Sequence, residues 1–389
     1  MTFLLFRRKI HNGKAINLLI YNSIHIFGSV RNVIMKKIIL TGGGTAGHVT
    51  PNIALLPALK EDGFEVSYIG SYKGMEKQLI ESQGIPYYGI SSGKLRRYFD
   101  WKNFTDPFRV LHGYFQAKRL LKKINPDVIF SKGGFVSVPV VLAAKRLHIP
   151  ALIHESDMTP GLANRLAMRG ATQVCCNFPE TVSKIEGNKG VLTGTPIRQE
   201  LMAGDATKGL SFCGFTADKP VLLIIGGSQG SVFINNAVRG SLDELLQEFQ
   251  IIHLCGKGNL DETLEGRTGY RQFEYISAEL PDLFAAASLI ISRAGANAIC
   301  ELLALRKPNI LIPLSLNASR GDQILNANSF EKQGFSKVLE EESVTAESLT
   351  ATVREVYKNR QTYIDSMNQN QSIDSITKIV SLLNDAVTQ

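Results

Sequence analysis

Short apolar runs alternate with longer segments of helical spacing along most of this chain. The runs are four or five residues long and end in turns, which is typical of buried parallel strands. Strands are predicted at 37–41, 65–69, 127–131, 151–154 and 173–177, and again at 221–225, 250–254, 272–276, 289–292 and 309–313. The alternation predicts an α/β fold built from doubly wound parallel sheets.

Helical patterns fill the gaps between these strands. They are predicted at 49–62, 75–83, 108–124, 138–147 and 161–168, and in the second half at 232–249, 281–287, 297–305, 323–333 and 346–358. The tail also has helical spacing, with apolar residues at Ile376, Ile379, Val380 and Leu383.

Two strand–glycine–helix openings lie about half a chain apart, at residues 42–47 and 226–230. They predict two Rossmann-like domains with parallel sheets that face a central cleft. We expect the first domain at 35–198 and the second at 199–370, with a closing helix at 371–389 that joins the first. Residues 1–34 are expected to be a disordered arm or an upstream start, with a membrane-surface helix as the alternative.

Composition narrows the class of protein. The net charge is +8, and the first 34 residues hold five basic residues and no acidic one. No arginine-rich helix or zinc-finger spacing supports nucleic acid as a partner, and no apolar run reaches the ~18 residues of a membrane span. The five cysteines form no C-x-x-C pair, so they are interpreted as reduced core residues rather than disulfides or metal ligands.

The glycine turn at 226–230 is a candidate anion site. It would place free backbone N–H groups at a helix start, and Ser228 and Gln229 add side-chain donors. A diphosphate is the expected ligand, and an ordinary strand-to-helix turn is the alternative.

The first turn, Gly42-x-Gly44-x-x-Gly47, matches the dinucleotide fingerprint, so a dehydrogenase has to be considered. That function needs an acidic residue at the end of the next strand to hold a ribose. The strand at 65–69 ends in Gly70, Ser71, Tyr72 and Lys73 instead, which argues against it.

Candidate acid–base residues follow strands of the first half. His48 comes directly after the glycine turn at the start of a helix, where a neutral imidazole can act as a general base or pack locally. Gly133 and Gly134 follow one strand, and Glu155 and Asp157 follow another. The carboxyl ends of parallel strands bind ligands, although a helix-capping role for Glu155 stays open.

Glu301 is a candidate ribose anchor in the second half. It lies one helical turn after Asn297, which follows another strand-to-helix turn, and Asp322 and Gln323 precede a further helix. A solvated helix residue is the alternative for Glu301.

Aromatic and basic residues interleave between 94 and 123. Leu95, Phe99 and Trp101 are the candidate membrane contacts, because apolar anchors among cations suit an anionic bilayer. A loop folded back on a core helix is the alternative.

In combination and order, these motifs resemble the bacterial MurG family of GT-B glycosyltransferases, from residue 35 to about 383. The residues that carry the resemblance are Thr41–His48, Lys132–Phe135, His154–Gly161 with Asn164, Gly194–Arg198, Gly226–Gly230 and Ser292–Gly295 with Glu301.

The resemblance implies transfer of N-acetylglucosamine from UDP-N-acetylglucosamine to undecaprenyl-diphosphate-linked N-acetylmuramoyl-pentapeptide, with inversion at the sugar. This is the lipid I to lipid II step of peptidoglycan synthesis, at the cytoplasmic face of the cell membrane. It implies a peripheral enzyme without cofactor or metal, with anionic lipid and other cell-wall synthesis proteins as further partners.

The resemblance also implies residue roles. His48 and Glu155 would be catalytic. Donor binding would involve Thr45, Ala46, Gly47, Arg198, Ser228, Gln229, Ile276, Glu301 and Gln323. Acceptor binding would involve Gly43, Gly44, Gly133, Gly134, Asp157 and Asn164.

Two positions depart from the family pattern. Many relatives carry Gln-Asn at Ser156-Asp157, and some carry Gln-Gln at Asp322-Gln323. The hydrogen bonds to donor sugar and ribose are therefore open, and Asp157 is a second candidate base. A diacylglycerol glycosyltransferase of the same fold and a non-catalytic nucleotide-sugar binding protein are the alternative functions.

Overall fold

The computed structural model describes residues 35–93, 102–227, 229–316, 319, 321–370 and 374–388, with backbone alone for 102–105 and 107. The chain divides into two compact units, residues 1–36 and 37–389, and the second holds the features described below.

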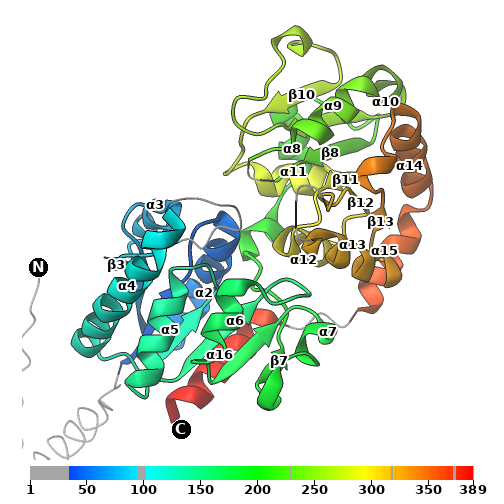
Figure 1. The fold of residues 1–389 in the computed structure, drawn as a ribbon. Coiled ribbons are helices and arrows are strands. Elements are labelled where there is room, and N and C mark those ends of the chain that lie inside the picture. The colour runs from blue at the N-terminus through cyan, green and yellow to red at the C-terminus, as the bar shows by residue number, and fades with distance from the viewer. Residues whose placement is uncertain are drawn as a thin grey trace, which may run out of the picture. The chain divides into compact units, whose positions relative to one another are not determined.

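Within the described residues, the N-terminal half contains a parallel sheet with the strand order β3-β2-β1-β4-β5-β6-β7 (Figure 1). Its strands are β1 (Lys36–Thr41), β2 (Phe64–Ser71), β3 (Tyr87–Ile90), β4 (Val128–Ser131), β5 (Ala151–Glu155), β6 (Gln173–Cys176) and β7 (Gly190–Leu192). Because the chain leaves β1 in one direction and returns at β4 on its other side, the loops after β1 and β4 diverge. Ligands bind at such a point in open α/β sheets.

Helices cover both faces of this sheet. They are α2 (Thr50–Glu61), α3 (Met75–Glu81), α4 (Lys102–Ile124), α5 (Ser137–Arg146), α6 (Leu162–Ala167) and α7 (Pro179–Val182), with short 3-10 turns at Ala46–His48, Glu186–Asn188 and Gln199–Ala203. The side chains of β1 alternate between two apolar cores: Ile38 and Leu40 pack in one, and Ile39 packs in the other. This alternation explains why an almost continuous apolar run forms a central strand.

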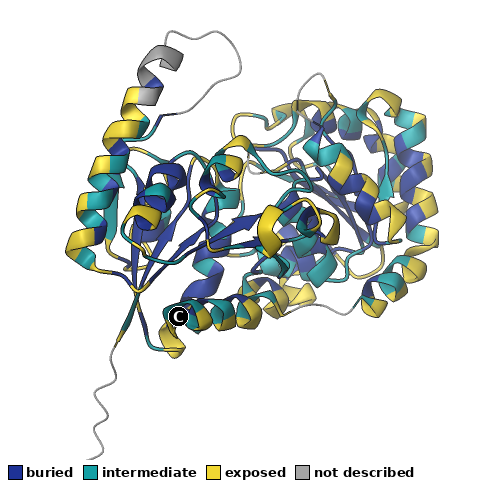
Figure 2. Cartoon of the chain, turned by 60° about the horizontal axis from the view of Figure 1, so that its bottom comes forward, coloured by how far each residue is buried: buried dark blue, intermediate teal, exposed yellow. Residues whose placement is uncertain are grey.

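The C-terminal half repeats the design with the strand order β10-β9-β8-β11-β12-β13, again all parallel. The strands are β8 (Val221–Ile225), β9 (Gln250–Leu254), β10 (Tyr270–Phe273), β11 (Leu289–Ser292), β12 (Asn309–Leu311) and β13 (Lys337–Val338). The helices are α8 (Ala206–Cys213), α9 (Val232–Gly240), α10 (Leu242–Glu248), α11 (Leu280–Ala286), α12 (Ala296–Ala304), α13 (Asp322–Lys332), α14 (Ala346–Lys358) and α15 (Arg360–Gln369), with 3-10 turns at Glu262–Leu264 and Glu341–Ser343. Figure 2 shows the strands buried and the outer faces of the helices exposed.

The last helix, α16 (Ser375–Thr388), packs on the N-terminal half, against α2 and β4 (Figure 1). Ile379 and Leu383 are fully buried in the same core as Ile38 and Leu40. The Nδ2 atom of Asn384 adds a 2.8 Å hydrogen bond to Asp62. The end of the chain is therefore an integral part of the N-terminal core.

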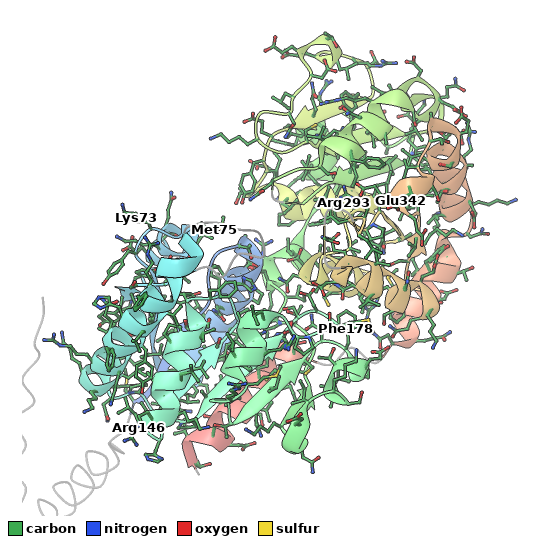
Figure 3. All side chains as sticks on the ribbon, in the orientation of Figure 1. Lys73, Met75, Arg146, Phe178, Arg293 and Glu342 are labelled. Atoms are coloured by element: carbon green, nitrogen blue, oxygen red, sulfur yellow. The ribbon has the colours of Figure 1, made fainter. Side chains whose placement is uncertain are left out.

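The loop after β5 contacts α13 of the C-terminal half. The Asp157 carboxylate accepts a 3.2 Å hydrogen bond from Asn326, and the Thr159 hydroxyl donates a 2.7 Å bond to Asp322. Phe178, labelled in Figure 3, packs edge-to-face on Phe330 of α13. Asp157 and Asp322 therefore both accept hydrogen bonds at this junction.

The predicted fold class is confirmed, and several element boundaries differ. The helix expected at 232–249 is two helices, since it breaks at Gly240 and Ser241, where the Ser241 hydroxyl bonds the carbonyl of Ala237. The strand expected at 272–276 is β10, at Tyr270–Phe273. β3 and β7 were not predicted, because such short segments with glycine show no clear apolar run.

Candidate active site

A cavity of about 450 Å³ lies at the carboxyl ends of the N-terminal strands. The turns after β1, β4 and β5 line it, together with Ser71 and Glu76. It contains eight of the predicted site residues: Gly43, Gly44, Thr45, His48, Gly134, Glu155, Asp157 and Asn164.

The imidazole of His48 is oriented by backbone. Its Nδ1 atom lies 3.0 Å from the carbonyl oxygen of Gly43 and 3.1 Å from the hydroxyl of Thr45. A carbonyl oxygen only accepts, so Nδ1 carries the proton and Nε2 has the free lone pair. Among the described residues, Nε2 makes no hydrogen bond. The ring therefore presents a basic nitrogen.

Burial, and to a smaller extent the nearby Lys132, lower the pKa of His48 to about 4, while the hydrogen bond to Gly43 and the charge of Glu76 oppose the shift. The imidazole is thus neutral at pH 7, the form in which it can act as a general base. Burial is the main cause of the shift.

Two buried side chains fix the backbone on which His48 lies. The Asn52 amide donates to the carbonyl oxygens of Thr41 and His48, at 3.2 and 3.5 Å. The Tyr68 hydroxyl donates a 2.8 Å bond to the carbonyl of Gly42. The turn is therefore held by the helix and the strand that follow it.

Glu76 is a site residue that the sequence did not reveal. Its fully buried carboxylate accepts from the backbone of Gly44 at 3.3 Å and from the backbone and hydroxyl of Ser71 at 3.0 and 2.5 Å. Because Glu76 is 32 residues from Gly44 in the chain, only the packing of α3 brings the two together.

The turns after β1 and β4 meet backbone to backbone. Gly134 has a φ of +86°, and a Cβ atom there would overlap the carbonyl oxygen of Gly43. Gly133 has a φ of +99°, and a Cβ atom on it would press on the Asn164 amide at 3.1 Å. Both glycines are therefore required by conformation and by space.

Glu155 is a buried carboxylate with three donors. It accepts from the backbone N–H groups of Asp157 and Gly161 at 3.0 and 3.1 Å, and from the Asn164 amide at 2.9 Å. Burial raises the pKa of Glu155 to about 7, Asp157 adds to the rise, and the hydrogen bonds oppose it. Its geometry organises the loop after β5 around the cavity.

Arg198, which precedes the 3-10 turn at Gln199–Ala203, and Glu301 of α12 form a sparsely bonded pair. Their Nη2 and Oε1 atoms lie 3.9 Å apart, and the side chains are 32% and 22% exposed. The Nε atom of Arg198 is buried without a hydrogen-bond partner in the described structure. Burial raises the pKa of Glu301 to about 7, against the influence of Arg198. The pair has spare donors and acceptors for a polar ligand.

Arg293 braces the turns after β8 and β11. It donates to the carbonyls of Ile312 and Pro313, to the Ser231 hydroxyl at 2.8 Å and to Glu341 at 2.7 Å. Ser231 in turn caps α9. Figure 3 labels Arg293 in the interior of the C-terminal half. The hydrogen bond from Arg293 to Ser231 therefore fixes the start of α9, the helix that follows the predicted diphosphate turn.

The diphosphate turn itself is a close backbone approach. Gly230 has a φ of +76°, and a Cβ atom there would overlap the carbonyl of Cys255. Gln229 is exposed, and Ser228 lies outside the described residues.

The structure does not link every predicted donor residue to Glu301. Ile276 packs on the core, and the Gln323 side chain accepts a 3.1 Å bond from the backbone of Leu314. Among the described residues, no hydrogen bond or ion pair joins Gln229, Ile276 or Gln323 to Glu301. Thr45, Ala46 and Gly47 lie on the His48 turn, and the Gly47 carbonyl accepts a 2.8 Å bond from Asn297 of α12.

The predicted membrane contacts Leu95, Phe99 and Trp101 lie outside the described residues. In the part of the chain that is described, no helix has both the length and the apolar character to cross a bilayer.

Comparison with known proteins defines the class. Residues 38–176 match the glycosyltransferase family 28 N-terminal domain, and residues 221–383 match the C-terminal domain of the same family. The chain therefore belongs to glycosyltransferase family 28 and is an enzyme that transfers a sugar.

Individual relatives narrow the comparison to the family predicted from the motifs. A UDP-N-acetylglucosamine–N-acetylmuramyl-(pentapeptide) pyrophosphoryl-undecaprenol N-acetylglucosamine transferase of Lachnospira eligens is 67% identical over 351 residues, 90% of this chain and 99% of the relative. The protein of the same name from Lachnoclostridium phytofermentans is 64% identical over 349 residues, 90% of this chain and 98% of the relative. The crystal structure of Acinetobacter baumannii MurG superposes with a TM-score of 0.70 at 27% identity, over 90% of this chain and 99% of that one. The predicted resemblance to the MurG family and the GT-B architecture are confirmed.

Proposed function

We propose that this enzyme transfers N-acetylglucosamine from UDP-N-acetylglucosamine to undecaprenyl-diphosphate-linked N-acetylmuramoyl-pentapeptide, which converts lipid I to lipid II. The relatives at 67% and 64% identity carry this donor and acceptor in their names. One observation carries the proposal: a cavity with a neutral histidine lies next to α12, the helix whose Glu301 forms a partly buried, sparsely bonded pair with Arg198.

The donor is assigned to the C-terminal half. Glu301, about one-fifth exposed and near Arg198, suits the paired hydroxyls of a ribose, since an ionised carboxylate accepts two strong hydrogen bonds. Arg198 offers a positive charge for the diphosphate and a buried Nε–H that bonds none of the described residues. The turn at 226–230, with Ser228 and Gln229, Ile276 and Gln323, completes the proposed donor set.

The acceptor is assigned to the 450 Å³ cavity of the N-terminal half. Gly43, Gly44 and Gly134 line this cavity, Gly133 directly precedes Gly134, and Asp157 and Asn164 add polar groups to the lining. Glu155 holds the loop that carries Asp157 and Asn164 through its three hydrogen bonds, and so acts chiefly as a positioning residue.

The reaction is a single displacement with inversion. The Nε2 atom of His48 takes the proton of the acceptor hydroxyl as its oxygen forms a bond to C1 of the donor sugar. The bond from C1 to the diphosphate oxygen breaks at the same time, and UDP leaves with the electron pair. Arg198 stabilises the charge that develops on the leaving diphosphate.

Contact with an anionic membrane is proposed for the outer face of α4. Phe108, Leu111 and Phe115 are 74%, 54% and 58% exposed, and Arg119 and Lys122 are exposed near them. These apolar residues recur at helical spacing, so one face presents anchors among cations. The proposed location is the cytoplasmic face of the cell membrane, where other cell-wall synthesis proteins would be available as partners.

The test is transfer of labelled N-acetylglucosamine from UDP-N-acetylglucosamine to three acceptors: lipid-linked muramoyl-pentapeptide, diacylglycerol and water. The proposal expects product with the first alone. Product with diacylglycerol would favour the related lipid glycosyltransferase. Donor binding without any product would indicate a non-catalytic binding protein.

A further inference from the structure

Lys132, the residue after β4, has a fully buried side chain. Its Nζ atom lies 2.7 Å from His154 Nδ1, 2.7 Å from the Ser156 hydroxyl and 3.0 Å from the Thr195 hydroxyl. Burial lowers the pKa of Lys132 to about 7, so its charge alone does not set the direction of these bonds. The carbonyl oxygens of Gly194 and Gly47 only accept, however, so His154 Nδ1 and the Thr195 hydroxyl both accept from Lys132.

The fixed directions extend beyond Lys132. Since Thr195 accepts from Lys132, its own proton points to the Asn297 Oδ1 atom at 3.2 Å. The Asn297 Nδ2 atom then donates a 2.8 Å bond to the carbonyl of Gly47. One directed chain of hydrogen bonds runs from Lys132 through Thr195 and Asn297 to Gly47, and such chains are cooperative.

Gly47 and Asn297, the last two members of this series of hydrogen bonds, belong to different parts of the proposed site. Gly47 immediately precedes His48, and Asn297 lies on α12, one helical turn before Glu301. Thr195 lies in the segment that leads to Arg198. Asn297 therefore connects the turn that carries the base to the helix that carries the donor anchor.

Packing alone does not account for a lysine at this position. Burial lowers its pKa to about 7, the nearby Cys300, Glu155 and Asp157 act in the opposite direction, and its three hydrogen bonds go to neutral groups. Burying an amine is unfavourable, whereas an apolar side chain of similar length would pack without that cost. The amine is best explained by the direction that its N–H donors impose on their partners.

We propose that Lys132, Thr195 and Asn297 are positioning residues that hold the Gly47–His48 turn in register with α12. They would set the distance between the base and the donor sugar without touching either substrate. This inference rests on the proposed function, because it concerns the geometry of that transfer.

The central variant is Thr195→Val, which keeps the shape and removes the hydroxyl that links Lys132 to Asn297. Misplacement of a base by about 1 Å costs up to ~100-fold in rate, so kcat is expected to fall about tenfold or more. The dissociation constant for UDP-N-acetylglucosamine without acceptor should stay within about twofold. Thr195→Ser restores the hydroxyl and should recover most of the rate.

Asn297→Asp tests the hydrogen bond between Asn297 and the Gly47 carbonyl. It can still accept from Thr195, but it places an acceptor against the Gly47 carbonyl, so kcat should fall again. Because both changes break the same chain, the double variant Thr195→Val/Asn297→Asp should be little slower than the slower single variant. Thr350→Val is the matched control, a buried threonine on α14 whose hydroxyl bonds the Ala346 carbonyl of the same helix, and it should leave kcat unchanged.

Wild-type turnover separates this inference from the proposed function. If the wild type makes no lipid-linked product, the proposed function fails. If the wild type makes the product, three results would overturn the positioning role. These are an unchanged kcat in Thr195→Val, a loss of donor affinity in Thr195→Val as large as its loss of kcat, and a kcat in Thr195→Ser no higher than in Thr195→Val. The positioning role would also be overturned if the fold-losses in kcat of the two single variants multiply in the double variant, because the two residues would then act independently.

Discussion

The Arg198 Nη2 and Glu301 Oε1 atoms lie 3.9 Å apart, and the buried Arg198 Nε atom has no hydrogen-bond partner among the residues that the structure describes. A direct, bidentate ion pair would leave little capacity for a ligand. This wider spacing leaves acceptors on Glu301 and donors on Arg198 for a ribose and a diphosphate. We therefore place the donor anchor at this pair.

Removal of the anchor should weaken donor binding. Glu301→Ala is expected to cost roughly 1–3 kcal/mol in UDP-N-acetylglucosamine affinity, the range for charge-assisted hydrogen bonds. Isothermal titration calorimetry measures it, and Glu200→Ala, an exposed acid near Arg198, is the control. Equal donor affinity in wild type and Glu301→Ala would remove Glu301 from the site.

Donor affinity should depend on pH through the same residue. Burial raises the pKa of Glu301 to about 7, so it is ionised above that pH and protonated below it. The ionised form accepts hydroxyl protons more strongly, and affinity should therefore fall roughly three- to tenfold from pH 8 to pH 6. Glu301→Gln should flatten this dependence. An unchanged slope in Glu301→Gln would assign the titration to another group.

The sequence predicted the parts of this site that depend on local pattern. The glycine turns, the strands before them and His48 are readable because each is defined by neighbouring residues. The hydrogen bonds of Glu76 to Gly44 and of Arg293 to Glu341 were not predicted, because the two partners lie 32 and 48 residues apart in the sequence. The spacing of apolar residues carries no information about such long-range contacts.

Lys132 illustrates the same limit. It is part of a recognisable motif, but the sequence alone does not show that its amine is buried or that Thr195, 63 residues later, lies beside it.

The break between α9 and α10 was not predicted for a different reason, since the apolar pattern continues across it.

Glu155 should act on the acceptor side alone. Glu155→Gln keeps the size of the side chain but places its NH2 group against one of the two backbone N–H donors, Asp157 or Gly161, so kcat/KM for the acceptor should fall about tenfold or more. The pKa of Glu155 is raised to about 7, so the wild type should lose acceptor kcat/KM as the pH falls through 7. Steady-state kinetics at saturating donor measures both. If Glu155→Gln retains that loss below pH 7, another group is responsible.

The outer face of α4 should control membrane binding. Phe108→Ser with Phe115→Ser removes two exposed anchors and should reduce sedimentation with vesicles of phosphatidylglycerol several-fold. Activity on a short-chain soluble acceptor should persist. Leu260→Ser, an exposed apolar residue of the C-terminal half, is the control. If the double variant sediments with vesicles as much as the wild type does, the outer face of α4 does not bind the membrane.

The most direct test of the account is the rate of N-acetylglucosamine transfer to lipid-linked muramoyl-pentapeptide by wild type and by His48→Ala, measured with both substrates saturating. Loss of a general base costs ~100- to 10,000-fold. We predict a fall in kcat within that range, with donor affinity largely kept because the donor anchor lies on α12. A His48→Ala enzyme with nearly full kcat, and an unmoved acidic limb of its pH–rate profile, would contradict the account and transfer the role of base to Glu155 or Asp157.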